Sequence, residues 1–225
     1  MAEATEAGRT WRGMPAGERD ALRRERLLAA GLQLFGTVGY RGTTVQGLCQ
    51  EAGVSSRSFY ELFEGREALL EAVYVRATQE IVAGLAAVRM PDDGGSGPGP
   101  GSGPGSGPGA VDEVVRAGVR AAIGPMLADE RLGRVVEIEA VGVSESLERR
   151  RRVTNLWIAR AADRLQEAMM AGGLIPRRPT GLSSIVMVGG VTEAMVAQIT
   201  SPGRQRLPAE DFLEEMARVI GRLLR

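Results

Sequence analysis

Residues 94–109 read GGSGPGPGSGPGSGPG and contain only glycine, serine and proline. Such a run has no apolar side chain to bury, so no contact offsets the conformational entropy that ordering it would cost. We expect a disordered connector that spans roughly 20–24 Å as a flexible coil. Any hydrophobic core must therefore be built from the two flanking segments, 1–93 and 110–225.

Apolar side chains recur at helical spacing in both segments, and no strand-like alternation stands out. The pattern is plainest near the end of the chain, where five apolar side chains share one helical face: Phe212, Met216, Val219, Ile220 and Leu223. The predicted helices cover 20–38, 43–52, 55–62, 66–88, 111–128, 130–141, 144–171, 182–200 and 208–224. An arm without periodicity precedes them at 1–19. The fold class that follows is all-α.

The composition excludes several kinds of chemistry. All 28 basic residues are arginine, histidine is absent, and there is one cysteine. A Ser-His-Asp triad, a histidine-based zinc site, a CxxC motif and a disulfide within the chain are therefore excluded. Glu137 and Glu139 lie two residues apart on a predicted helix, so they point in different directions and form no catalytic pair. We predict no enzymatic activity, no cofactor and no metal.

Charge and hydropathy indicate where the chain resides. The formal net charge is zero, so nucleic-acid affinity must come from local placement of arginine. No apolar run is read as reaching the roughly 18–20 residues that span a bilayer, and the N-terminus lacks a secretory apolar region. We expect a cytoplasmic protein.

The most informative stretch is 43–63, TTVQGLCQEAGVSSRSFYELF. Thr43 and Gln46 have capping-box spacing, so a short helix is expected to start at Thr43. Gly53 lies where a tight turn needs positive φ, and Ser55 is suited to cap the next helix. Two short helices joined by such a turn make a helix-turn-helix, whose second helix enters a major groove.

The start of that second helix supplies candidates for base contact. Arg57 can bond bidentately to guanine, and serine hydroxyls reach several base edges. Hydroxyls and guanidinium groups near helix starts are suited to phosphate contact. The candidate DNA-binding residues are Arg41, Thr43, Thr44, Ser55, Ser56, Arg57, Ser58, Tyr60 and Arg66. The alternative for each is an ordinary solvated side chain.

The region from Arg23 to Ala72, which contains this stretch, resembles the TetR-type family of helix-turn-helix regulators. The matching elements are Leu27-Leu28-x-Ala30, Leu34-Phe35, Gly39-Tyr40, Thr43-Thr44-Val45, Leu48, Ala52-Gly53-Val54-Ser55, Phe59-Tyr60, Phe63 and Arg66-Glu67-x-Leu69-Leu70. Four positions depart from the family pattern: Cys49 replaces the usual alanine, Glu61-Leu62 replace an aromatic-His pair, and Arg66 replaces the usual lysine. Glu61 and Glu64 also place negative charge close to the DNA side.

The resemblance implies an all-helical homodimer with an effector pocket in the C-terminal domain. It assigns the dimer interface to the last two helices, 182–200 and 208–224, and the coupling between pocket and DNA to the helix that begins at Arg66. Methionine and tryptophan are suited to an adaptable apolar pocket. The pocket candidates are Met126, Trp157, Met169, Met187 and Met195, with ordinary core packing as the alternative.

These patterns predict five segments along the chain. They are an arm at 1–19, a DNA-binding domain at 20–65, a connecting helix at 66–93, the connector at 94–109, and an effector-binding and dimerisation domain at 110–225. The predicted function is a ligand-responsive regulator, most simply a repressor that binds a palindromic operator as a homodimer and is released by a small apolar or amphipathic effector. Two alternatives remain open: a small-molecule-binding protein whose helix-turn-helix does not engage DNA, and a DNA-binding regulator without an effector.

The run Arg149-Arg150-Arg151-Arg152 invites an interpretation as a nucleic-acid patch. Consecutive helical residues point about 100° apart, so the four side chains form no stripe. Glu145 and Glu148 precede them at ion-pairing distance along a helix, which favours a solvated, salt-bridged face. An anionic effector site or an interface is the alternative.

Overall fold

The structure is a computed structural model that describes residues 16–90, 108–176 and 180–224. Every regular element in these residues is helical, which confirms the all-α prediction. Residues 1–15 of the predicted arm and 94–107 of the predicted connector lie outside the described residues.

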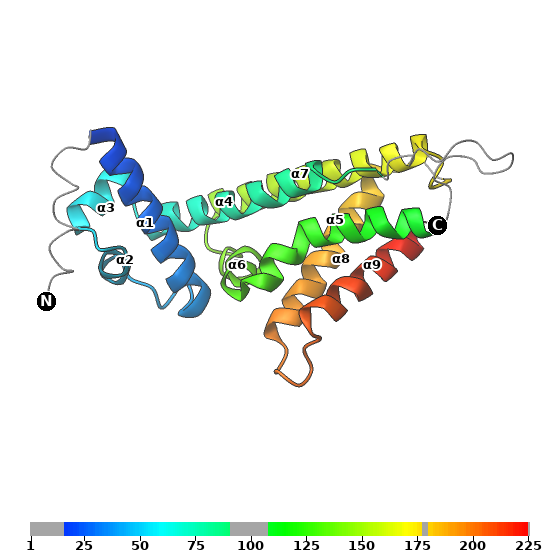
Figure 1. Ribbon diagram of the computed structural model, residues 1–225. Helices are drawn as coiled ribbons and strands as arrows, with labels where there is room; N and C mark the ends of the chain where they lie inside the picture. The colour runs from blue at the N-terminus through cyan, green and yellow to red at the C-terminus, as the bar shows by residue number, and fades with distance from the viewer. Residues whose placement is uncertain (1–15, 91–107, 177–179, 225) are drawn as a thin grey trace, which may run out of the picture.

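Three helices form an N-terminal head: α1 (Ala16–Thr37), α2 (Val45–Ala52) and α3 (Ser56–Leu62). Helix α1 begins four residues before the predicted start at Asp20, so residues 16–19 belong to the helix and not to the arm. The head is held by fully buried side chains from all three helices, among them Leu27, Leu48 and Phe59. In Figure 1 it stands at one end of an elongated molecule.

The remaining helices form a larger body. They are α4 (Arg66–Ala86), α5 (Pro108–Ala128), α6 (Glu130–Arg134), the π-helix η1 (Val135–Glu139), α7 (Glu145–Ala171), α8 (Gly181–Thr200) and α9 (Ala209–Leu224). Helix α4 leaves the head and runs beside α7, while α5 lies along α9 (Figure 1). Because α5 begins at Pro108, the last two residues of the predicted connector are helical instead.

The stretch predicted as one helix at 130–141 is two elements. An α-helical turn, α6, passes directly into η1, and single π-turns of this kind are frequent at functional sites. Glu137 and Glu139 point in different directions, as predicted: Glu137 lines a cavity in the body, whereas Glu139 reaches the head.

Helix α8 leaves most of its apolar surface uncovered. Leu182, Ile185 and Val186 are 69%, 47% and 64% exposed. Among the described residues α8 is long and apolar enough to cross a membrane by length and composition, and 11% of its most apolar stretch is buried. The expectation that no apolar run reaches this length is therefore wrong, because glycine and serine between the aliphatic residues do not lower the hydropathy enough.

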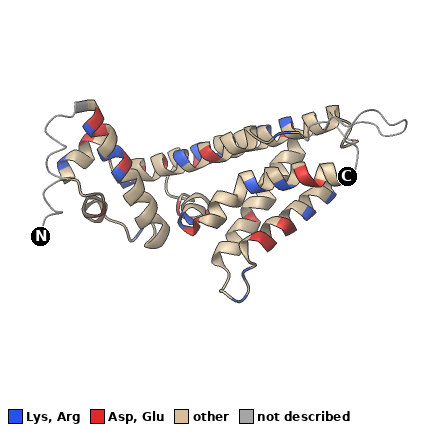
Figure 2. Ribbon diagram, viewed as in Figure 1, with Lys and Arg blue, Asp and Glu red and all other residues tan. Residues whose placement is uncertain are grey.

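Charged side chains are interspersed along the body helices (Figure 2). One predicted ion pair of the arginine run is found, since Arg149 lies 3.6 Å from Glu145. Glu148 pairs with Arg151, and Arg150 lies 3.0 Å from Glu71 on α4. Arg151 differs from its neighbours because its side chain is largely buried and lines the cavity described below.

Candidate nucleic-acid interface and ligand pocket

The turn between α2 and α3 is built by local hydrogen bonds. The Thr44 hydroxyl accepts a hydrogen bond from the Gly47 amide at 3.1 Å, so Thr44 caps α2 where Thr43 was predicted to do so. Gly53 has φ of 63°, the left-handed conformation that the turn requires. The Ser55 hydroxyl accepts from the Ser58 amide at 3.1 Å and caps α3 as predicted. These bonds fix the angle between the two helices.

Helix α3 presents polar side chains to solvent and buries Phe59 against the head. The Arg57 side chain is 90% exposed and Tyr60 is 59% exposed. Ser56 also lies on the exposed side. The Arg57 Nε donates a hydrogen bond to Glu61 at 3.1 Å, so without DNA the guanidinium pairs within its own helix. This face offers an arginine, hydroxyls and a tyrosine to a groove.

Two predicted DNA contacts have structural partners instead. Thr43 is buried, and its hydroxyl donates to the Gly39 carbonyl at 2.8 Å, so its side chain does not reach the surface. The Arg66 guanidinium donates to the carbonyls of Tyr40 and Thr43 and lies 4.9 Å from the Tyr40 ring centroid. Arg66 therefore holds the loop before α2 in place. Arg41, Thr44 and Ser55 are exposed near α2 and α3.

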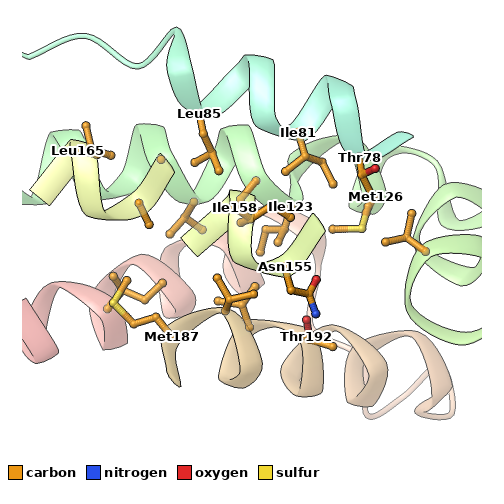
Figure 3. Close-up of a pocket in the computed structure, with 18 of the residues that line it drawn as sticks. Thr78, Ile81, Leu85, Ile123, Met126, Asn155, Ile158, Leu165, Met187 and Thr192 are labelled. Atoms are coloured by element: carbon orange, nitrogen blue, oxygen red, sulfur yellow. The ribbon is translucent and has the colours of Figure 1, made fainter. Parts of the chain in front are cut away.

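A cavity of about 120 Å³ lies in the body between α4, α5, α7 and α8 (Figure 3). Its wall is mostly apolar, with Ile81, Leu85, Ile123 and Ile158 among the lining side chains. Ligand pockets commonly measure roughly 300–1,000 Å³, so an effector of ordinary size must push lining side chains apart.

The structure places three of the five predicted pocket residues in the wall of the cavity and two outside it. Met126, Met169 and Met187 line the cavity. Trp157 does not, because it lies on the outer face of α7 with 55% of its surface exposed. Met195 is fully buried in the core and lies outside the cavity wall.

Sequence reasoning missed the polar part of the wall, which includes Glu137, Arg151 and Asn155. Burial raises the pKa of the Glu137 carboxyl to about 7, against the smaller opposing effect of the nearby Arg151 charge. No sequence motif indicates this, because the burial of Glu137 depends on helices that are distant in the chain. Tyr74, also in the wall, has its pKa raised by burial and hydrogen-bonds to Thr154.

Residues 27–73 match the family model described as bacterial regulatory proteins of the tetR family. In this part of its length the chain is similar to the tetR family. The match spans α1 to the first part of α4 and contains both helices of the helix-turn-helix. No curated protein matches the sequence.

Solved TetR-like structures share the whole fold. The fatty acid degradation regulator FadR from Bacillus halodurans superposes with a TM-score of 0.71 at 15% identity, over 90% of this chain and 96% of that one. A tetR-family regulatory protein from Rhodococcus RHA1 gives 0.67 at 16% identity, over 90% and 96%. FadR from Bacillus subtilis in complex with stearoyl-CoA gives 0.66 at 14% identity, over 89% and 96%.

The head and the body meet at a close contact between α1 and the α6–η1 segment. The Arg131 guanidinium donates to the Gln33 side-chain oxygen at 2.5 Å. A Cβ on Gly36 would lie 2.4 Å from the Arg131 Cβ, so only glycine fits there. The Glu139 carboxylate accepts a hydrogen bond from the Tyr40 amide at 2.8 Å. The π-helix η1 thus touches the head through Glu139 and the cavity through Glu137, two residues apart.

Proposed function

We propose that this chain is a ligand-responsive transcriptional repressor that binds a palindromic operator as a homodimer and is released by an apolar or amphipathic effector. The observation that carries the proposal is the exposed polar face of α3, with Arg57 and Tyr60, within a TetR-family DNA-binding domain. We assign DNA binding to residues 16–65, coupling to α4, and effector binding and dimerisation to residues 110–225. Helices α5 to α9 form a body with no catalytic role in this proposal, and the protein acts in the bacterial cytoplasm at its operator.

The uncovered surface of α8 and α9 supports the homodimer. Val186 on α8 is 64% exposed, and Leu223 on α9 is 68% exposed. Contiguous apolar surface of this kind marks interaction sites, and a two-fold dimer covers the same patch on both copies. Gly189 and Gly190 on α8 have open space where a side chain would be, which permits close approach of a second helix.

The wall of the cavity supports an effector that regulates DNA binding. Helix α4 carries Arg66, which holds the loop before α2, and further along lines the cavity with Thr78, Ile81 and Leu85. An effector that opens the cavity therefore displaces α4, whose first residue, Arg66, is bonded to the head. Two-fold operators place half-sites about 34–36 Å apart, so a small change in the separation of the two α3 helices weakens binding. FadR from Bacillus subtilis, which has the same fold, was solved with stearoyl-CoA.

Substitution of the α3 face tests the DNA-binding role. We expect Arg57→Ala and Tyr60→Ala each to weaken binding to the upstream DNA of the gene by about tenfold or more, the value of a base or phosphate contact. Arg149→Ala removes the same charge from the outer face of α7 and serves as the control. Equal affinity of all four proteins would contradict the proposal.

A second candidate function is a ligand-binding protein whose helix-turn-helix does not engage DNA. The ion pair between Arg57 and Glu61 favours it, because the arginine most suited to a base is already neutralised. Glu61→Gln separates the two functions. If DNA binding is real, this change frees Arg57 and raises affinity, whereas a non-binding head gains no sequence-selective affinity.

A further inference from the structure

The polar groups in the wall of the cavity are of two kinds. Some are already bonded within the protein: the Thr78 hydroxyl donates to the Tyr74 carbonyl at 2.9 Å, and the Gln166 amide donates to the Ser184 hydroxyl at 2.8 Å. A ligand gains little from such groups, because their hydrogen-bonding capacity is in use.

Others have no hydrogen bond or ion pair to any of the residues that the structure describes. They are the Glu137 carboxyl, the Asn155 amide and the Thr192 hydroxyl, which all line the cavity. The Nε of Arg151 is buried and likewise without a hydrogen-bond partner in the described chain. Figure 3 shows Asn155 and Thr192 facing each other from α7 and α8. The Glu137, Asn155 and Thr192 side chains are partly exposed, and their unpaired oxygens are the acceptors that a bound polar head would satisfy. The buried Arg151 Nε is a donor and is not among these acceptors.

The charges around this polar end do not balance. Glu137 and Arg151 are the charged side chains in the described wall of the cavity. Arg151 is paired with Glu148 at 3.2 Å, and Glu148 also accepts a hydrogen bond from the Gly142 amide. Arg151 lies near enough to Glu137 for its charge to oppose the raised pKa of that carboxyl, but its ion pair is with Glu148, outside the cavity, and Glu137 has no ion pair among the described residues. The group that complements this end is a cation.

The apolar lining of the cavity extends along α4. It follows α4 from Tyr74 to Leu85, about 16 Å at 1.5 Å per residue. Glu137 interacts electrostatically with Tyr74, which places the charge at the Tyr74 end. Leu85 and Leu165 lie at the other end (Figure 3). Flexible methionines in the wall, such as Met187, allow the cavity of about 120 Å³ to widen around an unbranched chain.

We propose that the effector is a cationic amphiphile, a slender apolar chain that ends in one positively charged nitrogen, with the nitrogen against Glu137 and the chain toward Leu85. This inference rests on the proposed effector pocket and adds the charge and shape of its ligand. The Asn155 carbonyl oxygen and the Thr192 hydroxyl are positioned to accept further hydrogen bonds from a protonated amine.

Three probes with the same chain test the charge: decyltrimethylammonium, 1-decanol and decanoate, titrated calorimetrically into the intact protein at pH 8 below their micellar concentrations. We expect the cation to bind at least tenfold more tightly than the other two. In Glu137→Gln the affinity for the cation should fall at least tenfold while that for decanol changes less than threefold. Glu145→Gln, an exposed carboxylate at the start of α7, should leave all three affinities unchanged.

The pH dependence provides a second readout. The titratable or charged groups that face Glu137 are Tyr74 on α4 and Arg151 on α7. Glu148 on α7 pairs with Arg151, and Glu139 on η1 pairs with Arg134. Burial raises the pKa of Glu137 to about 7, whereas that of Glu148 is lowered by its hydrogen bond from the Gly142 amide. The affinity for the cation should therefore rise about tenfold from pH 6 to pH 8, and should stay flat in Glu137→Gln.

The possible outcomes distinguish failure of the cationic ligand class from failure of the proposed effector pocket. If decanol or decanoate binds as tightly as the cation, or if Glu137→Gln leaves the preference intact, the cationic class is wrong and the apolar pocket stands. If none of the three probes binds, both the pocket and its ligand class are overturned. The melting temperature of Glu137→Gln without ligand verifies that the variant is folded.

Discussion

At the scale of single residues, the pKa of Glu137 is set by packing and not by a sequence motif. In the unfolded chain its pKa is close to the ordinary 4.5, and in the folded chain burial raises it to about 7. The folded state therefore holds the proton more tightly than the unfolded state. The resulting stabilisation is complete below pH 4.5 and is lost as the pH rises through 7.

Glu137→Gln should remove this pH dependence. We expect the variant to gain stability over the wild type as the pH rises from 5 to 8, with a difference in the free energy of unfolding of roughly 1–3 kcal/mol at pH 8. Urea unfolding at the two pH values measures it, and Glu145→Gln, at a 96% exposed side chain, is the control. A difference that does not grow between pH 5 and pH 8 would contradict the assignment.

Local chemistry explains which residues were predictable. The caps of α2 and α3 and the left-handed Gly53 depend on near neighbours in the chain, so the sequence predicts the bounds of the two helices within two residues. Burial depends on distant segments, and here prediction failed. Thr43 faces inward because its hydroxyl bonds to the Gly39 carbonyl, and Trp157 faces outward because the opposite side of α7 meets α4 and α8.

At the scale of elements, the contact between α1 and α6 joins head and body. Gly36→Ala should destabilise the protein by about 1–3 kcal/mol, because the new Cβ would lie 2.4 Å from the Arg131 Cβ and force the helices apart. Gly17→Ala is the matched control in the same helix, since nothing lies within 4 Å of its added Cβ, and it should be neutral or slightly stabilising. Urea denaturation compares the two, and equal stabilities would show that α1 and α6 are not closely packed.

The π-helix η1 forms the second link between these parts. Glu139→Ala removes the acceptor of the Tyr40 amide, so this amide should exchange with deuterium at least tenfold faster than in the wild type. Glu145→Ala should leave the exchange unchanged. Mass spectrometry of the peptide that spans Tyr40 provides the measurement, and an unchanged rate in Glu139→Ala would mean that η1 does not hold the head.

The sequence predicts one continuous helix where α6 and η1 stand, because its apolar spacing does not distinguish a π-turn from an α-turn. The wider turn arises where Glu137 is directed to the cavity and Glu139 to the head, contacts made with α4, α7 and the α1–α2 loop. The contacts with α4 and with the α1–α2 loop bring together residues that lie about 60 to 100 positions apart in the chain, as Tyr40 and Glu139 do. The apolar periodicity within one segment does not predict such contacts.

At the scale of the whole molecule, the apolar surface of α8 and α9 predicts a dimer. Val186→Arg places a charge on the exposed apolar surface of α8 and should shift the protein from dimer to monomer in sedimentation velocity. Val153→Arg, at another exposed valine, on α7, should leave the dimer intact. A wild-type protein that sediments as a monomer at micromolar concentration would contradict the interface.

The proposed regulatory function depends on sequence-selective DNA binding by the head. The most direct measurement is the affinity of the intact protein for the DNA upstream of its own gene and for a scrambled duplex of equal length, by fluorescence anisotropy over a range of salt concentrations. We predict binding at least about 1,000-fold tighter to the upstream DNA, with affinities that fall linearly on logarithmic axes as salt rises. Equal affinity for the two duplexes at every salt concentration would contradict it.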